Sequence, residues 1–150
     1  MNNRNLYFLV LLISSCSSVD KSAQTKNIFR YNESSGIHSF DPAFAKDQSR
    51  IWFCNQVYNS LVQLDDTLQV QASIAKRWSV SNNSLIYNFV LRDDVQFHMP
   101  LNRSLTIEDV VYSLTRLKSE ETASPGAWVL SSMQSLVALN DSTLQIRLKE

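Results

Sequence analysis

The sequence predicts a mixed α/β fold, because its hydrophobic residues change their period along the chain. Near residues 48–62 and 105–121, apolar residues recur every three to four positions, which is the spacing of one helix face. From Trp78 onward, and again near residues 143–148, apolar positions recur every second residue, which indicates strands. We therefore expect helices and strands to share one domain over residues 28–150.

The first fifteen residues have the layout of a secretory signal peptide. A single positive charge, Arg4, precedes eight apolar residues at positions 6–13, and small residues follow. Eight apolar residues are far too few to cross a bilayer, which takes about 20. Residues 1–15 are therefore predicted to be a leader that is removed.

Cys16 is the predicted lipid attachment site. The preceding Ile13, Ser14 and Ser15 resemble the motif in which a bacterial lipoprotein cysteine receives diacylglycerol. A polar stretch follows, and we interpret residues 16–27 as a lipid-anchored flexible tether. The alternative is a buried strand that contains a cysteine. With Cys16 acylated, Cys54 would be the only free thiol.

Composition excludes several classes of function. The chain carries 14 basic and 14 acidic residues, so its charge gives no reason to expect nucleic acid binding. Its glycines, Gly36 and Gly126, lie too far apart for a phosphate-binding loop or a G-x-S-x-G nucleophile elbow. Its histidines, His38 and His98, have neither metal-ligand spacing nor a recognisable catalytic context. We expect no metal, no cofactor and no enzymatic activity.

The domain is expected to open with a strand at "NIFRY", followed by a turn at "NESSG". A helix over residues 48–62 should follow, with Ile51, Cys54, Tyr58 and Leu61 on its apolar face. Cys54 is then a small buried hydrophobic residue rather than a reactive thiol. The next stretch, "IAKRW", is predicted to form a short helical turn.

An antiparallel meander is predicted next, with strands near residues 77–81, 85–91 and 95–98. A second helix should begin after Thr106, which suits an N-cap and can form a capping box with Asp109. "TASPGAW" is a loop, and "QSLVALNDSTLQIRLKE" is a hairpin. The core is expected to combine strand and helix residues that face each other. These residues are Tyr87, Phe89, Leu91, Val110 and Leu114.

Five stretches resemble the amino-terminal part of the extracellular solute-binding proteins of family 5. They are "FDPA", "QVYNSLVQLD", "IAKRWSVS", "YNFVLRDDVQFH" and "LTIEDVVYSLTRL", and they occur in this order within residues 28–150. The sequence departs from the family pattern at "MPLNRS", where a glycine turn is usual. The resemblance implies part of the first lobe of a type II periplasmic-binding-protein fold. It also implies that the chain ends inside that lobe, so we expect it to bind peptide weakly or not at all by itself.

The resemblance further implies a lipoprotein that binds oligopeptides or dipeptides for an ABC importer. Its partners would be the peptide, the permease subunits and the membrane, and its place the cell envelope, facing the periplasm or exterior. In the family, the loop after the first strand faces the ligand, and here it corresponds to Asn32, Glu33, Ser34 and Ser35. An ordinary solvated turn is the alternative for that loop. Nickel, haem or a sugar remain alternative ligands, and a small envelope interaction lipoprotein remains an alternative function.

Overall fold

The computed structural model describes residues 28–149, and these belong to two compact units. Residues 28–32 belong to the first unit, in which the rings of Phe29 and Tyr31 stack with centroids 6.5 Å apart. No strand forms over residues 28–33, so the strand expected at "NIFRY" is wrong for its described part. Strand-forming residues need a neighbouring strand to pair with, and local composition does not supply one. The predicted leader and Cys16 lie outside the described residues.

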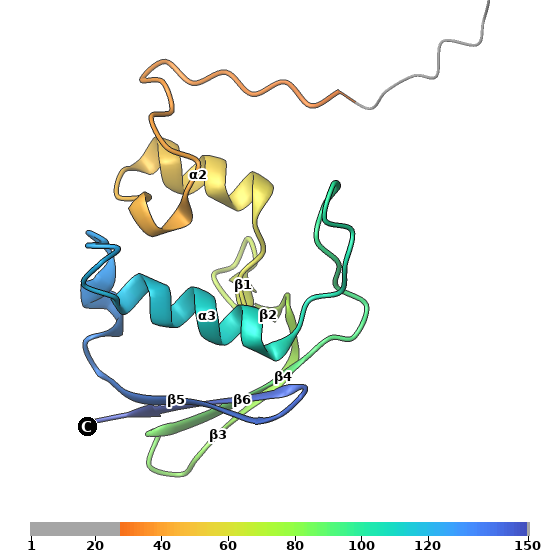
Figure 1. Ribbon diagram of the computed structural model, residues 1–150, viewed down its shortest axis with the longest axis vertical. Coiled ribbons are helices and arrows are strands. Elements are labelled where there is room, and N and C mark those ends of the chain that lie inside the picture. The colour runs from red at the N-terminus through yellow and green to blue at the C-terminus, as the bar shows by residue number, and fades with distance from the viewer. Residues whose placement is uncertain (1–27, 150) are drawn as a thin grey trace, which may run out of the picture. The chain divides into compact units, whose positions relative to one another are not determined.

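The second unit, residues 33–149, contains two α-helices, two short 3-10 helices and six strands in its described part (Figure 1). The helical elements are η1 (Pro42–Phe44), α2 (Gln48–Val57), α3 (Ile107–Lys118) and η2 (Ala127–Leu130). The strands are β1 (Val62–Leu64), β2 (Val70–Ala72), β3 (Ala75–Val80), β4 (Ile86–Leu91), β5 (Met133–Asn140) and β6 (Thr143–Leu148). None of these helices combines the length and the apolar character that a bilayer span requires. The mixed α/β fold predicted from the sequence is confirmed.

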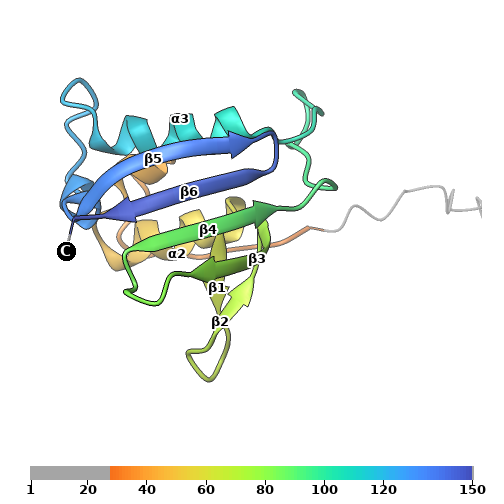
Figure 2. The same cartoon turned by 90° about the horizontal axis from the view of Figure 1, so that it is seen from below.

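The main sheet is antiparallel, with strand order β3-β4-β6-β5 (Figure 2). Trp78 pairs with Phe89, Phe89 with Leu144 and Leu144 with Ala138, so these side chains share one face. The helix α3 packs on this face, and α2 lies beyond α3 on the side away from the sheet (Figure 1). The predicted β3–β4 pairing and the predicted β5–β6 hairpin are both confirmed.

The core lies between α3 and this face of the sheet. Leu91, Ile107, Val110 and Leu144 are buried there, and Phe89 and Leu114 are among the half-buried residues that pack against them. The predicted sharing of one core by strand and helix residues is thus confirmed for Phe89, Leu91, Val110 and Leu114. Tyr87 is half-buried and lies opposite Ile146 in the sheet.

Three predicted elements differ from the structure. "IAKRW" is not helical: its last four residues begin β3, because Ala75 and Trp78 join the ladder with β4. Residues 95–98 form only an isolated bridge between Gln96 and Ser104, because the other side of β4 is taken by β6. The first helix ends at Val57 rather than near residue 62, because the backbone of Tyr58 is extended and β1 follows.

The amino-terminal cap of α3 forms as predicted. The backbone N–H of Thr106 donates to Oδ2 of Asp109 at 2.9 Å, within a capping box. The guanidinium of Arg103 holds the same carboxylate with two hydrogen bonds of 2.7 Å. Glu108 and Asp109 begin the helix, and Arg116 and Lys118 end it, so these charges favour the helix dipole.

Candidate ligand-binding site

The predicted ligand loop is a turn attached to the start of α2. Ser34 and Ser35 form the turn, and Gly36 follows with φ +68°, a left-handed conformation that glycine adopts without strain. The N–H and hydroxyl of Ser35 donate to Oε1 of Glu33 at 3.3 and 2.9 Å. The Ser35 hydroxyl also lies 2.8 Å from the hydroxyl of Ser49, in the first turn of α2.

The structure therefore brings two of the four predicted residues into direct contact. Glu33 and Ser35 are joined by hydrogen bonds, while Ser34 is exposed at the tip of the turn. Asn32 is exposed and belongs to the first unit. Short polar side chains and backbone groups at such a turn can pair with the N–H and C=O groups of a ligand.

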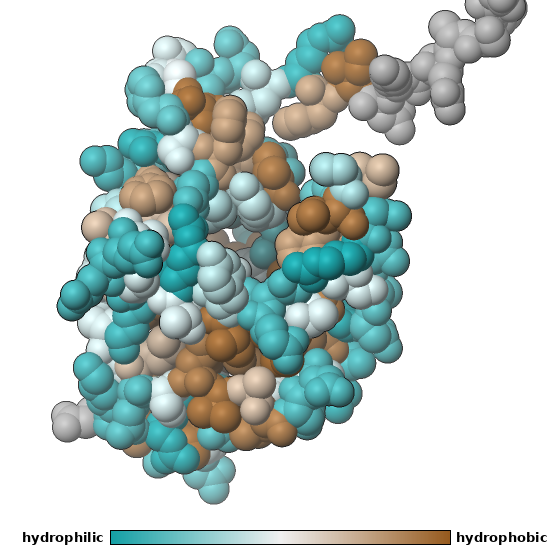
Figure 3. Space-filling model, in the orientation of Figure 1, coloured by the Kyte–Doolittle hydropathy of each residue, from teal (hydrophilic) through white to brown (hydrophobic). Residues whose placement is uncertain are grey.

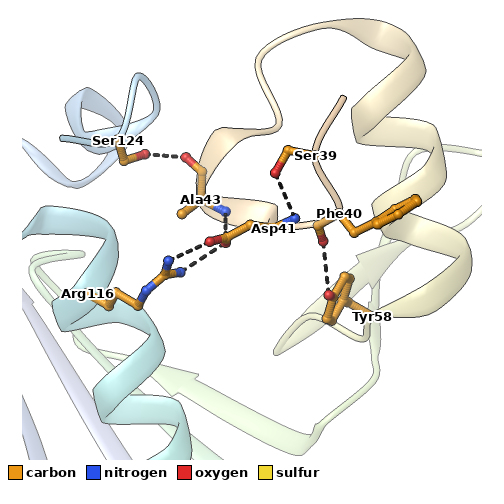
Figure 4. Close-up of polar contacts among 7 residues, drawn as sticks. All are labelled: Ser39, Phe40, Asp41, Ala43, Tyr58, Arg116 and Ser124. Carbon is orange, nitrogen blue, oxygen red and sulfur yellow. Dashed lines mark hydrogen bonds and ion pairs between the residues drawn. The ribbon is translucent and has the colours of Figure 1, made fainter. Parts of the chain in front are cut away.

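The "FDPA" segment that follows this loop is fixed by a charged pair. Asp41 caps η1 by accepting from the N–H of Ala43 at 3.0 Å, and Arg116 of α3 donates to both of its carboxylate oxygens at 2.9 and 2.5 Å (Figure 4). The hydrogen bonds from Arg116 hold the pKa of Asp41 below its ordinary value, although partial burial opposes this shift. The loop is thereby tied to a helix that is itself part of the core.

Two further hydrogen bonds hold the same segment (Figure 4). The hydroxyl of Tyr58, just after α2, donates to the carbonyl of Phe40 at 2.9 Å. The buried hydroxyl of Ser124 donates to the carbonyl of Ala43 at 2.5 Å. We name Asp41, Arg116, Tyr58 and Ser124 the clamp, because together they fix the base of the candidate loop from three parts of the chain.

The clamp was not predicted from the sequence. In the sequence, "FDPA" supports only a family resemblance, and the pattern around Arg116 indicates only a helix. Asp41 and Arg116 are 75 positions apart, and no local period connects them. An aspartate just before a proline is a known helix-capping pattern, and this signal could have assigned the Asp41 cap but not its partner.

The described residues also include a buried thiol. Cys54 is buried on α2, as predicted, and burial raises the pKa of its thiol, with the charge of Asp41 adding to the effect. Between residues 28 and 149, no three His, Cys, Asp or Glu side chains lie together in a way that could hold a metal ion. The arrangement offers hydrogen-bonding groups on a positioned turn.

Comparison with known proteins shows the family to which the chain belongs. Residues 69–150 match the family described as bacterial extracellular solute-binding proteins, family 5 Middle. The chain belongs to this family, and its fold is part of a lobe of the type II periplasmic-binding-protein fold.

Three relatives illustrate the match. The probable deoxycholate-binding periplasmic protein YgiS of Escherichia coli is 32% identical over 137 residues, which cover 87% of this chain and 25% of YgiS. The structure of the murein tripeptide binding protein MppA of Escherichia coli matches with a TM-score of 0.69 and 27% identity, covering 75% of this chain and 25% of that one. NikZ of Campylobacter jejuni, solved with Ni(L-His), matches with a TM-score of 0.67 and 27% identity, over 75% of this chain and 22% of NikZ. The chain thus spans about a quarter of the length of the relatives that it matches.

Proposed function

We propose that the chain acts in a substrate-binding lipoprotein of an ABC importer that binds oligopeptides or dipeptides. Its family membership supports a solute-binding role, and this is the observation that carries the proposal. The family consists of binding proteins, which supports a role without catalysis. Periplasmic relatives support a place in the cell envelope, facing the periplasm or exterior, with permease subunits as partners.

Peptide is the ligand that we favour among those named for the relatives. These names include deoxycholate, murein tripeptide and Ni(L-His). A peptide presents a row of backbone N–H and C=O groups, and each one left unpaired in a buried site costs about 1–3 kcal/mol. The turn at Ser34 and Ser35 supplies hydroxyl and backbone groups of the matching kind.

Asn32, Glu33, Ser34 and Ser35 are the proposed ligand contacts. Glu33 and Ser35 already bond to each other, and Ser49 holds Ser35 on α2, so the turn needs little reordering when a ligand binds. A preorganised turn loses less conformational entropy on binding than a mobile one. Ser34 would offer an exposed hydroxyl, and Asn32 an exposed amide, to the ligand backbone.

Peptide uptake by the bacterium that carries the gene tests this function. A deletion strain should lose uptake of radiolabelled trialanine, and the wild-type gene should restore it. With the double variant Ser34→Ala/Ser35→Ala, the restored uptake at low peptide concentration should be about fivefold lower than with the wild-type gene, because both serine hydroxyls of the loop are removed. Asn82→Ala, in the exposed turn between β3 and β4, is the matched control and should behave as wild type.

Two uptake results would contradict the proposal. Unchanged uptake of both dipeptides and tripeptides in the deletion strain would remove the transport role and favour a small envelope lipoprotein without a small-molecule ligand. Full activity of the double variant, at equal protein level on an immunoblot, would remove only the assignment of the loop.

Lipidation at Cys16 is proposed from the sequence alone and has its own test. Labelled palmitate should be incorporated into the wild-type protein and into Cys54→Ala, because Cys54 is buried on α2. Cys16→Ala should carry no label. Label that persists in Cys16→Ala would remove the lipoprotein assignment and leave the solute-binding proposal standing.

A further inference from the structure

A hollow with a volume of about 630 Å³ lies between three segments of the second unit. They are the connection from α2 to β1, the loop that precedes α3, and the first half of α3. Figure 3 shows the hollow, with hydrophobic residues on its rim. Its volume is within the range of about 300–1,000 Å³ that is typical of small-molecule sites.

The floor of the hollow is the edge of the core. Val110 and Leu114 of α3 line it together with Leu61, and all three also belong to the core or pack against it. Ser113 lies on the same face of α3, where its small side chain leaves space. Because the floor is held by the core, it keeps its shape without a ligand.

The rim is apolar and exposed. Val57, Met99 and Leu101 line the hollow and are 42%, 77% and 63% exposed. Scattered exposed apolar residues are ordinary, but here they surround a concave apolar floor. An apolar occupant would remove this surface from water, which is the main favourable contribution to binding for such a site.

The walls offer no uncompensated charge. Asp109 is the acidic residue of the lining, and both of its oxygens accept hydrogen bonds of 2.7 Å from Arg103. That guanidinium also lies over the ring of Phe97, 4.4 Å from its centroid. The polar side chains at the mouth include Gln96 and His98, which are exposed and can form hydrogen bonds. The occupant that fits is therefore uncharged, with a polar group near the mouth.

We propose that this hollow binds an uncharged, mainly apolar small molecule, at a site separate from the Glu33–Ser35 turn. The volume fits one molecule of drug size, the apolar floor and rim supply the attraction, and the neutralised Asp109 disfavours an ionic ligand. The site is independent of the proposed peptide contacts, which lie at the opposite end of α2.

Titration with N-phenyl-1-naphthylamine, an uncharged fluorescent probe, tests the site. The full chain carrying Cys16→Ser, so that no lipid is attached, should bind one probe per chain in the micromolar range. Ser113→Trp should fill the hollow and weaken binding by about tenfold or more. Thr115→Trp is the matched control on α3, does not line the hollow, and should leave affinity within about twofold.

A second pair of variants covers the case in which Ser113→Trp fails to fold. Leu101→Asp puts a charge on the rim and should weaken probe binding, while Leu68→Asp, in the exposed β1–β2 turn, should not. Non-saturable fluorescence, or equal affinity in Leu101→Asp and wild type, would overturn the proposal. So would a wild-type dimer that Ser113→Trp converts to a monomer in sedimentation, because a second copy would then occupy the hollow.

Discussion

Residues 60–148 and residues 33–58 are held together by different forces. The first region surrounds a core in which Ile107 and Leu144 are 2% and 0% exposed. In the second region, Ala43 and Cys54 are buried, but Phe40 and Trp52 are 59% and 54% exposed. The second region is instead attached to the first by two polar contacts of the clamp, from Arg116 to Asp41 and from Ser124 to Ala43.

Because of this difference, local opening should begin in residues 33–58. Burial of apolar side chains contributes about 1.5–3 kcal/mol each, whereas a hydrogen bond contributes about 0.5–1.5 kcal/mol net. Residues 33–35 of the candidate ligand loop therefore lie in the region that opens at lower free energy.

Leu144→Ala should have the largest effect. Its side chain is fully buried between β4, β5 and α3, and truncation of a buried leucine costs about 2–5 kcal/mol. Denaturant unfolding should show a lower midpoint for the whole of residues 33–149. Leu139→Ala, at a 53% exposed position of β5, is the control and should change stability little. Equal effects of the two variants would mean that the register of β5 and β6 is wrong.

Acid should weaken the core region through Asp109. The hydrogen bonds from Arg103, the largest cause, help to lower the pKa of Asp109 to about 2, from an ordinary value of 3.8. A lowered pKa means that the carboxylate stabilises the fold above about pH 4, and that this contribution is lost as the pH falls toward 2. After allowance for solvent screening around half-exposed Arg103, the loss should be about 1–2 kcal/mol.

Asp109→Asn provides the measurement for this pH effect. Its free energy of unfolding should depend less on pH between pH 4 and pH 2 than that of wild type. The difference in slope should correspond to the uptake of up to about one proton on unfolding. Asp93→Asn, at an exposed position outside these contacts, should retain the wild-type slope. An identical slope in Asp109→Asn would exclude Asp109 as the titrating group.

Asp41→Asn should act on the second region alone. It weakens the pair with Arg116, and because both side chains are about one-third exposed, the expected cost is about 1–2 kcal/mol. Amide hydrogen exchange should quicken over residues 47–58 while β4 and β6 keep their protection. Asp94→Asn, which breaks the exposed pair with Arg92, is the control. A uniform loss of protection would show that the two regions unfold as one.

Tyr58→Phe should have the smallest effect. It removes one hydrogen bond to the carbonyl of Phe40, at a 46% exposed position where water replaces the lost donor. We expect a loss of about 0.5 kcal/mol. In a Cys16→Ser background, the buried Cys54 thiol should react with a disulfide reagent slightly faster than in wild type. Tyr112→Phe, on the exposed face of α3, should leave that rate unchanged, and an equal increase in both variants would exclude the hydrogen bond as its cause.

Elements with a strong local signal could be predicted from the sequence. The alternation around Phe89 predicted β4, and Thr106 with Asp109 predicted the start of α3. Local signals failed where two patterns compete over few residues. The five residues of "IAKRW" suit a helical turn, but Ala75 and Trp78 gain ladder partners in β4, and this pairing decides the outcome.

Partner choice was the other source of error. The run near Phe97 alternates as a third strand would, and a hairpin to its neighbour β4 was the simplest expectation. The structure pairs β4 with β6 instead, over five residue pairs from Ile86 to Val90. This pairing buries Leu144, which is more than 50 positions away from β4 along the chain, so no local pattern could reveal it.

The fold class, the start of α3, the β5–β6 hairpin and the family resemblance follow from the sequence alone, because each depends on residues near one another in the chain. The tertiary structure decided the order of the sheet, the hollow beside α3 and the attachment of the candidate loop. The pair of Asp41 and Arg116 illustrates the reason. Charged side chains pair when they are close in the folded structure, whatever their separation along the chain. Only the packing of α3 on the sheet brings Arg116 close to Asp41.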